Sequence, residues 1–147
     1  TCKPCDFPKE FVLDEYKIHQ SKVQLMVNDG DTIDLGNRTI QIIHTPGHSP
    51  GHCCFYEPER KYLYSGDLIY KGCLDFFYPT TNPVLFYESV KKIQTYSINK
   101  ILPGHHTLNL ECKIIDEIAD AFSQLETNGK LYQGVGLFDF GEFQIHI

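Results

Sequence analysis

The chain has 147 residues, of which 41% are hydrophobic and 22% are charged, a composition typical of one globular domain rather than of a disordered segment. Its formal net charge of -6, without a cluster of basic residues, argues against a nucleic acid as the main partner. No apolar run approaches the length of about 18 residues that a membrane-spanning helix needs, so a membrane partner is not expected either.

Residues 1–22 are expected to form an irregular N-terminal segment, because prolines interrupt them and no apolar period develops. Residues 23–147 are expected to form the folded domain. The chain starts without an initiator methionine or an apolar signal segment, so we expect a piece of a longer protein or a processed product. The missing signal and the cysteines, which we interpret as free thiols, favour a cytoplasmic location. Cys2 and Cys5 have metal-knuckle spacing, but no second pair follows, and we expect an ordinary loop there.

Alternating polar and apolar residues predict a series of short strands in the first half of the domain. The first covers Lys22–Val27 and leads into a turn at Asn28–Asp31, where Gly30 supplies a positive φ. Further strands are expected over Thr32–Leu35, Arg38–His44, His52–Tyr56 and Lys61–Ser65.

Residues 68–82 are rich in aromatic side chains and show no regular period, so we expect a long binding or lid loop. One helix should begin near Asn82, which is a good N-cap followed by Pro83. A second should cover about Leu110–Leu125 and end at Asn128–Gly129. A short strand over Lys100–Leu102 separates the helices, and Gly134–Phe140 with Phe143–Ile147 predict a terminal hairpin.

Three turns place metal-capable side chains directly after predicted strands. They are His44-Thr45-Pro46-Gly47-His48-Ser49-Pro50-Gly51-His52, Ser65-Gly66-Asp67 and Pro103-Gly104-His105. Glycine allows a sharp turn and proline fixes φ, so we expect rigid loops that converge at one edge of a sheet. Zinc takes imidazole and carboxylate ligands. The pattern therefore predicts His48, Asp67 and His105 as metal ligands, with Asp67 able to bridge two metals through its two oxygens.

Each of these residues also has an ordinary interpretation, since a histidine beside a turn is usually solvated or packed. Among the other histidines, we expect His44 to be packed or to support a ligand, His52 to support His48 by hydrogen bonding, and His106 to face a substrate pocket. Four aromatic residues either line a pocket for an apolar acyl group or belong to the core. They are Tyr70, Phe76, Phe77 and Tyr78.

The string H-T-P-G-H-S-P-G-H, followed by S-G-D and P-G-H, resembles the later motifs of the metallo-β-lactamase superfamily, in its glyoxalase II-like and general zinc-dependent hydrolase branch. The resemblance implies an α+β fold that forms half of an αββα sandwich, with a mixed or antiparallel sheet and helices on one face. It implies His48 as a ligand of the first metal, Asp67 as the bridging ligand and His105 as a ligand of the second. Two zinc ions are implied per complete site, with iron or manganese possible.

The same resemblance implies a hydrolase that uses metal-bound hydroxide on an ester, thioester, lactone or related bond of a small-molecule substrate. The family's H-x-H-x-D-H signature is absent from this sequence, so the chain resembles the C-terminal portion of such an enzyme and is expected to be inactive alone. We expect it to form a homodimer or to pair with the missing N-terminal half. The alternatives are an iron-dependent oxidoreductase or dioxygenase of the same fold, and a non-catalytic remnant that acts as an interaction module.

Overall fold

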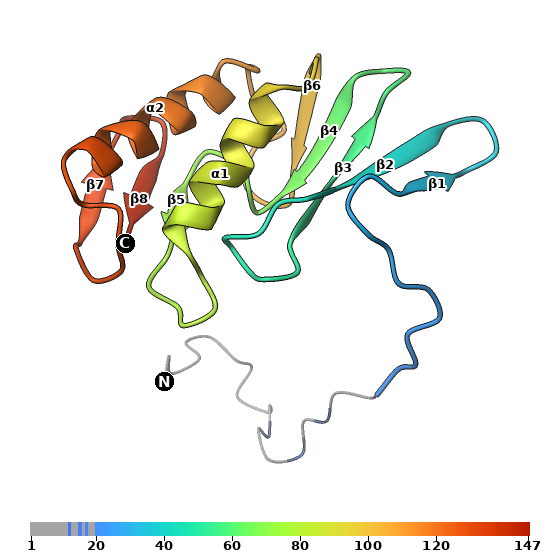
Figure 1. Ribbon diagram of the computed structural model, residues 1–147, viewed down its shortest axis with the longest axis horizontal. Helices are drawn as coiled ribbons and strands as arrows, with labels where there is room; N and C mark the ends of the chain where they lie inside the picture. Colours follow the sequence, from blue (N-terminus) through green and yellow to red (C-terminus); the bar gives the residue numbers. More distant parts are fainter. Residues whose placement is uncertain (1–11, 13–14, 16, 18–19) are drawn as a thin grey trace.

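The computed structural model describes residues 12, 15, 17 and 20–147, so most of the expected irregular segment, with Cys2 and Cys5, lies outside the described residues. The described residues form two β-sheets and two helices (Figure 1). None of the helices in this part of the chain is long and apolar enough to cross a membrane.

The larger sheet has five strands in the order β1-β2-β3-β4-β6. These are β1 Thr32–Asp34, β2 Thr39–His44, β3 Cys53–Glu57, β4 Tyr62–Gly66 and β6 Lys100–Pro103. All neighbours are antiparallel except β4 and β6, which are parallel, so the expected mixed sheet is confirmed. The strand predicted over Lys22–Val27 is wrong. That segment is irregular, with Leu25 75% and Met26 83% exposed, because no neighbouring strand pairs with it.

The smaller sheet has three strands in the order β5-β8-β7. They are β5 Cys73–Asp75, β7 Leu137–Asp139 and β8 Gln144–His146. β7 and β8 are antiparallel and form the predicted terminal hairpin, whereas β5 and β8 are parallel. β5 lies inside the segment predicted as a loop. A strand of three residues is too short to show the two-residue period on which the prediction relied.

The two helices are α1, Pro83–Gln94, and α2, Ile114–Thr127. α1 begins as predicted, because the Asn82 side-chain oxygen accepts a hydrogen bond from the Leu85 amide at 3.0 Å. α2 begins later than predicted. The chain before it makes a tighter turn, in which the Ile114 amide donates to the Glu111 carbonyl at 3.1 Å.

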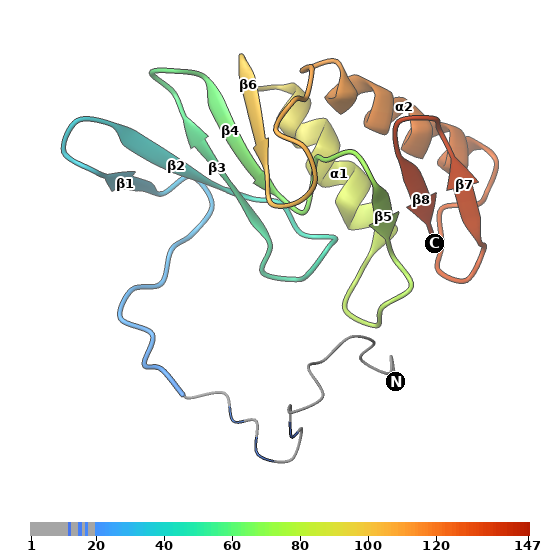
Figure 2. The same ribbon diagram turned by 180° about the vertical axis from the view of Figure 1, so that it is seen from behind.

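The helices cover one face of the sheets, and the view from behind shows the strands in front of them (Figure 2). Side chains from both sheets and both helices form one buried core, as the α+β prediction expected. At its centre the rings of Phe76, Phe86 and Phe122 pack edge-to-face or stacked, with centroids 4.7, 5.2 and 5.6 Å apart. Burying each of these rings contributes about 1.5–3 kcal/mol, so the loop before α1 is fixed to both helices.

The first turns of α1 dock on the loop between β2 and β3. The Asn82 amide donates to the Gly47 carbonyl at 2.7 Å, and the Ser89 hydroxyl donates to the Pro46 carbonyl at 2.7 Å. Gly47 has a φ of +137°, and a Cβ there would lie 2.4 Å from the backbone of Phe86. Only glycine fits this contact, so α1 sets the position of the loop.

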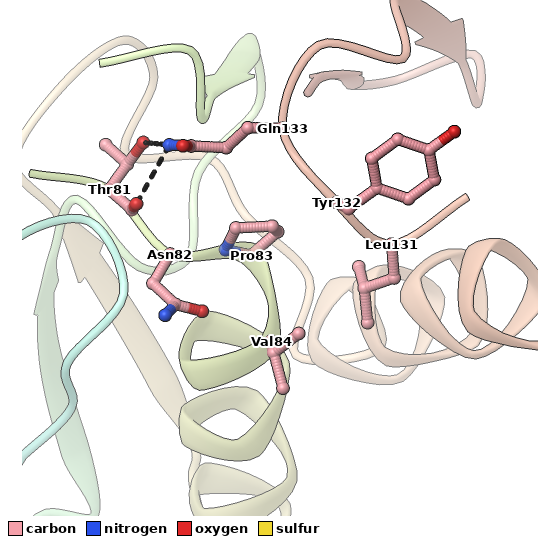
Figure 3. A pocket seen from close by; sticks show the side chains of 7 residues that line it. All are labelled: Thr81, Asn82, Pro83, Val84, Leu131, Tyr132 and Gln133. Atoms are coloured by element: carbon pink, nitrogen blue, oxygen red, sulfur yellow. Dashed lines mark hydrogen bonds between the residues drawn. The ribbon is translucent and has the colours of Figure 1, made fainter. Parts of the chain in front are cut away.

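The segment before α1 is held from its other side by Gln133. The Gln133 side-chain nitrogen lies 2.8, 2.9 and 3.0 Å from the carbonyl oxygens of Phe76, Tyr78 and Thr81, which share its two N–H donors. A cavity of about 240 Å³ lies beside this contact (Figure 3). Its lining consists of Thr81, Asn82, Pro83, Val84, Leu131, Tyr132 and Gln133. The side chain of one distant residue thus anchors the segment that leads into α1.

Replacing Gly47 with alanine should destabilise the fold, because the added Cβ meets the α1 backbone and the left-handed φ is strained. We expect Gly47→Ala to lower the free energy of unfolding by about 2–4 kcal/mol in urea titrations. Gly51→Ala is the matched control in the same loop, since no atom lies within 4 Å of its added Cβ, and it should change stability by less than about 0.5 kcal/mol. Equal effects of the two substitutions would contradict this packing.

Candidate metal centre

The ends of β4 and β6 meet through their backbones. The Gly104 amide donates to the Gly66 carbonyl at 2.9 Å, and Gly66 lies opposite Pro103 in the parallel register. A Cβ on Gly104 would come within 3.2 Å of the Gly66 oxygen, which is tighter than an ordinary contact. Gly66 is the last residue of β4, and Gly104 directly follows β6. Because these two glycines are hydrogen-bonded, the residues that follow them, Asp67 and His105, leave the sheet side by side.

The structure brings His48, Asp67 and His105 together. The Nε2 atom of His105 lies 2.8 Å from Oδ1 of Asp67, and the Nε2 atom of His48 lies 3.4 Å from Oδ2. The two imidazoles therefore approach different oxygens of one carboxylate. The side chains of His48, Asp67 and His105 are 41%, 27% and 63% exposed, so an ion could reach them from solvent.

His52 holds the Asp67 backbone. Its Nε2 atom lies 3.1 Å from the Asp67 amide nitrogen, and its Nδ1 atom lies 3.1 Å from the Thr45 carbonyl oxygen and 2.9 Å from the Thr45 hydroxyl. A backbone amide can only donate, so Nε2 accepts and the ring proton sits on Nδ1, which donates to Thr45. Burial lowers the pKa of His52 and favours this neutral form. The supporting role expected for His52 therefore acts on the backbone of Asp67, with Thr45 as a partner that the sequence did not suggest.

Tyr70 forms one wall beside the carboxylate. Its ring stacks on His106, with centroids 5.5 Å apart, and meets the edge of His105 at 6.2 Å. The Tyr70 hydroxyl donates to the Cys73 carbonyl at 2.8 Å, and burial raises the pKa of this hydroxyl. Gly72 has a φ of +145°, and a Cβ there would lie 2.6 Å from the His106 ring. His106 is exposed at the surface and packs against this wall.

The remaining residues singled out in the sequence lie apart from this contact. His44 is exposed, and its ring Nε2 lies 2.9 Å from the Pro50 carbonyl oxygen, so it is not packed in the sheet. Phe76 belongs to the core, whereas Phe77 and Tyr78 are each 43% exposed. The aromatic loop thus divides into core residues and surface residues.

A sequence model of the metallo-beta-lactamase superfamily matches residues 4–105, which is more than half of the chain. The chain belongs to this superfamily. Membership implies metal binding, commonly of zinc, and supports hydrolase activity in the family.

Named relatives agree with this assignment, and a solved structure shares the fold. The chain is 32% identical over 95 residues to acyl-coenzyme A thioesterase MBLAC2 of Homo sapiens, an alignment that covers 62% of this chain and 34% of the relative. It is 31% identical over 85 residues to hydroxyacylglutathione hydrolase of Chelativorans sp. strain BNC1, covering 57% and 32%. A crystal structure of a metallo-beta-lactamase family protein from Thermus thermophilus superimposes with a TM-score of 0.60 at 20% identity, covering 75% of this chain and 39% of that one. The chain thus spans about a third of the length of the curated relatives it matches.

The donor set at Asp67 fits a borderline metal such as zinc. Two imidazole nitrogens flank a carboxylate, and both kinds of donor are usual zinc ligands. Calcium and magnesium prefer sites built from oxygen alone, which this arrangement does not offer.

Removing the His52 ring should destabilise the loop that carries Asp67. His52→Phe leaves the partly buried Asp67 amide without its acceptor, and we expect a loss of about 1–3 kcal/mol of unfolding free energy. His44→Phe, at the exposed end of β2, should cost less than about 0.5 kcal/mol. Urea unfolding of both variants checks this, and a His52 variant as stable as the wild type would refute the assigned hydrogen bond.

Proposed function

We propose that this chain forms part of a zinc-dependent thioester hydrolase. The observation that supports it best is the Asp67 carboxylate, which presents one oxygen to His48 and the other to His105. A carboxylate with an imidazole beside each oxygen offers donors that two metal ions could share. The names of both relatives describe an acyl group carried on a thiol, which makes a thioester the preferred member of the ester, thioester and lactone class.

In this proposal His48 would hold the first metal, His105 would hold the second, and Asp67 would be a ligand that the two share. Zinc at these positions would supply a Lewis acid that activates water and polarises the substrate carbonyl. His52 keeps the Asp67 backbone in place by accepting a hydrogen bond from the Asp67 amide. Tyr70 contacts the ring of His105 and limits its rotation.

The proposed ligand set is incomplete within this chain. The 147 residues contain no His-x-His, so the H-x-H-x-D-H ligands must come from elsewhere. A second copy of this chain could not supply them, which favours pairing with an N-terminal half over a homodimer. The sheet face turned away from the helices supports such pairing, since Phe55 lies there in register with Ile42 and Tyr64 and is 41% exposed.

The four cysteines in the described part of the chain are unpaired. This supports the proposal of a reducing compartment such as the cytoplasm.

Thioester hydrolysis should require both the missing ligands and Asp67. In the presence of zinc, the 147-residue chain alone should not accelerate the hydrolysis of an acyl-coenzyme A above the background rate. The chain fused behind an H-x-H-x-D-H half from a superfamily thioesterase should hydrolyse it. In the fused protein Asp67→Asn should lower kcat by roughly 100-fold or more.

Asp120→Asn is the control in the same fusion, because Asp120 is an exposed carboxylate on α2. It should keep full activity. Metal analysis of the active protein should find zinc. A zinc-loaded fusion that hydrolyses no thioester, or one whose activity survives Asp67→Asn, would overturn the proposal, and iron in place of zinc would favour oxidative chemistry.

A further inference from the structure

A second group of metal-capable side chains lies on the smaller sheet. β5 and β8 run parallel and side by side (Figures 1 and 2), with Cys73 opposite Gln144 and Asp75 opposite His146. Side chains alternate along a strand, so Cys73, Asp75 and His146 share one face while Leu74 and Ile145 point into the core. This group lies on the smaller sheet, whereas His48, Asp67 and His105 lie in loops at the ends of strands of the larger sheet.

The three donors are already spaced like ligands of one ion. The Cys73 Sγ lies 3.2 Å from Oδ1 of Asp75, the His146 Nδ1 lies 3.4 Å from the same oxygen, and all three donor atoms lie within 4.8 Å of one another. In a tetrahedral site with zinc bonds of about 2.0–2.3 Å, neighbouring donors stand about 3.3–3.6 Å apart. The two separations from the Asp75 oxygen, 3.2 Å to Cys73 and 3.4 Å to His146, lie close to these values.

The backbone around the group is held at several points. The Phe76 amide donates to the His146 carbonyl at 2.7 Å, and the Gln144 amide donates to the Gly72 carbonyl at 2.8 Å. The Lys71 ammonium and the Glu142 carboxylate form an ion pair of 2.9 Å between the segments that lead into β5 and β8.

The His146 ring is also restricted by packing. The Phe77 ring lies against it with a centroid distance of 4.7 Å, which limits its rotation while Nδ1 faces Asp75. Metal sites depend on ligands that are oriented before the ion binds, and this imidazole meets that requirement.

A cysteine nucleophile is the competing interpretation, and the geometry argues against it. In a cysteine–histidine pair the imidazole contacts the thiol and takes its proton. Here Asp75 lies between Cys73 and His146 and contacts both.

We infer that Cys73, Asp75 and His146 form a zinc-class metal site that ties the C-terminal strand β8 to β5. A thiol, an imidazole and a carboxylate are all zinc ligands, and the sulfur favours such an ion over magnesium or calcium. The side chains of His146 and Asp75 are 41% and 38% exposed, so the ion has access and a water can complete the coordination. A metal that binds only the folded chain stabilises it, and the stabilisation grows with the logarithm of the affinity.

Cobalt titration tests this site, because a sulfur-to-cobalt charge-transfer band in the near ultraviolet arises only from a thiolate ligand. The anaerobic experiment uses the 147-residue chain with Cys2→Ser and Cys5→Ser, which removes the Cys-x-x-Cys pair near the N-terminus. We expect one equivalent of cobalt to produce the band and zinc to abolish it. Cys73→Ser should remove the band, and His146→Gln should weaken cobalt binding by roughly 100-fold or more.

Cys112→Ser, at another partly buried cysteine, is the matched control and should keep the band. Asp67→Asn should also keep it, which separates this site from the proposed thioesterase centre, where no thiol is present. Thermal unfolding of the Asp67→Asn variant gives a second measurement, because zinc should raise its Tm. Adding His146→Gln to this variant should abolish the increase. Absence of the band, or its survival in Cys73→Ser, would overturn the inference.

Discussion

The hydrogen bond between the Gly104 amide and the Gly66 carbonyl is the contact on which the candidate site depends. It joins β4 and β6 where both leave the sheet, and it requires two backbones to approach so closely that a side chain on Gly104 would be crowded. Asp67 and His105 follow directly in the chain. Their 2.8 Å contact therefore follows from the backbone pairing of β4 with β6.

His48 reaches the same carboxylate by a different route. Its loop is positioned by α1, through the Asn82 amide and the close approach of Gly47 to Phe86. The helix is in turn fixed by the aromatic core and, through the segment before it, by Gln133. Residues from far-apart parts of the chain thus determine where one imidazole lies, which explains why a small candidate site needs the whole fold.

Much of the candidate site could be predicted from the sequence because its signals are local. Glycine and proline beside His48, Asp67 and His105 mark turns at strand ends, and side chains at neighbouring strand ends meet at one edge. The hydrogen bond from the Asp67 amide to His52 could not be predicted from the sequence. The sequence predicted that His52 hydrogen-bonds to His48, whereas in the structure it holds the backbone of Asp67. The role of Thr45 depends on a register that no local pattern shows.

The smaller sheet could not be predicted in full for a physical reason. The terminal hairpin of β7 and β8 is local and was expected, but β5 has three residues and pairs with a strand near the end of the chain. Cys73 and Asp75 therefore seemed to lie in a loop, and His146 carried no signal. The segment around Leu25 was predicted as a strand but is irregular, because an alternating pattern forms no strand without a neighbouring strand to pair with.

The most direct measurement of the central claim is a crystal structure of the chain soaked in zinc, with anomalous differences recorded at the zinc absorption edge. The account predicts a zinc peak within bonding distance of an Asp67 carboxylate oxygen and of Nε2 of His48 or His105. Zinc peaks elsewhere on the chain, with none at Asp67, would contradict it.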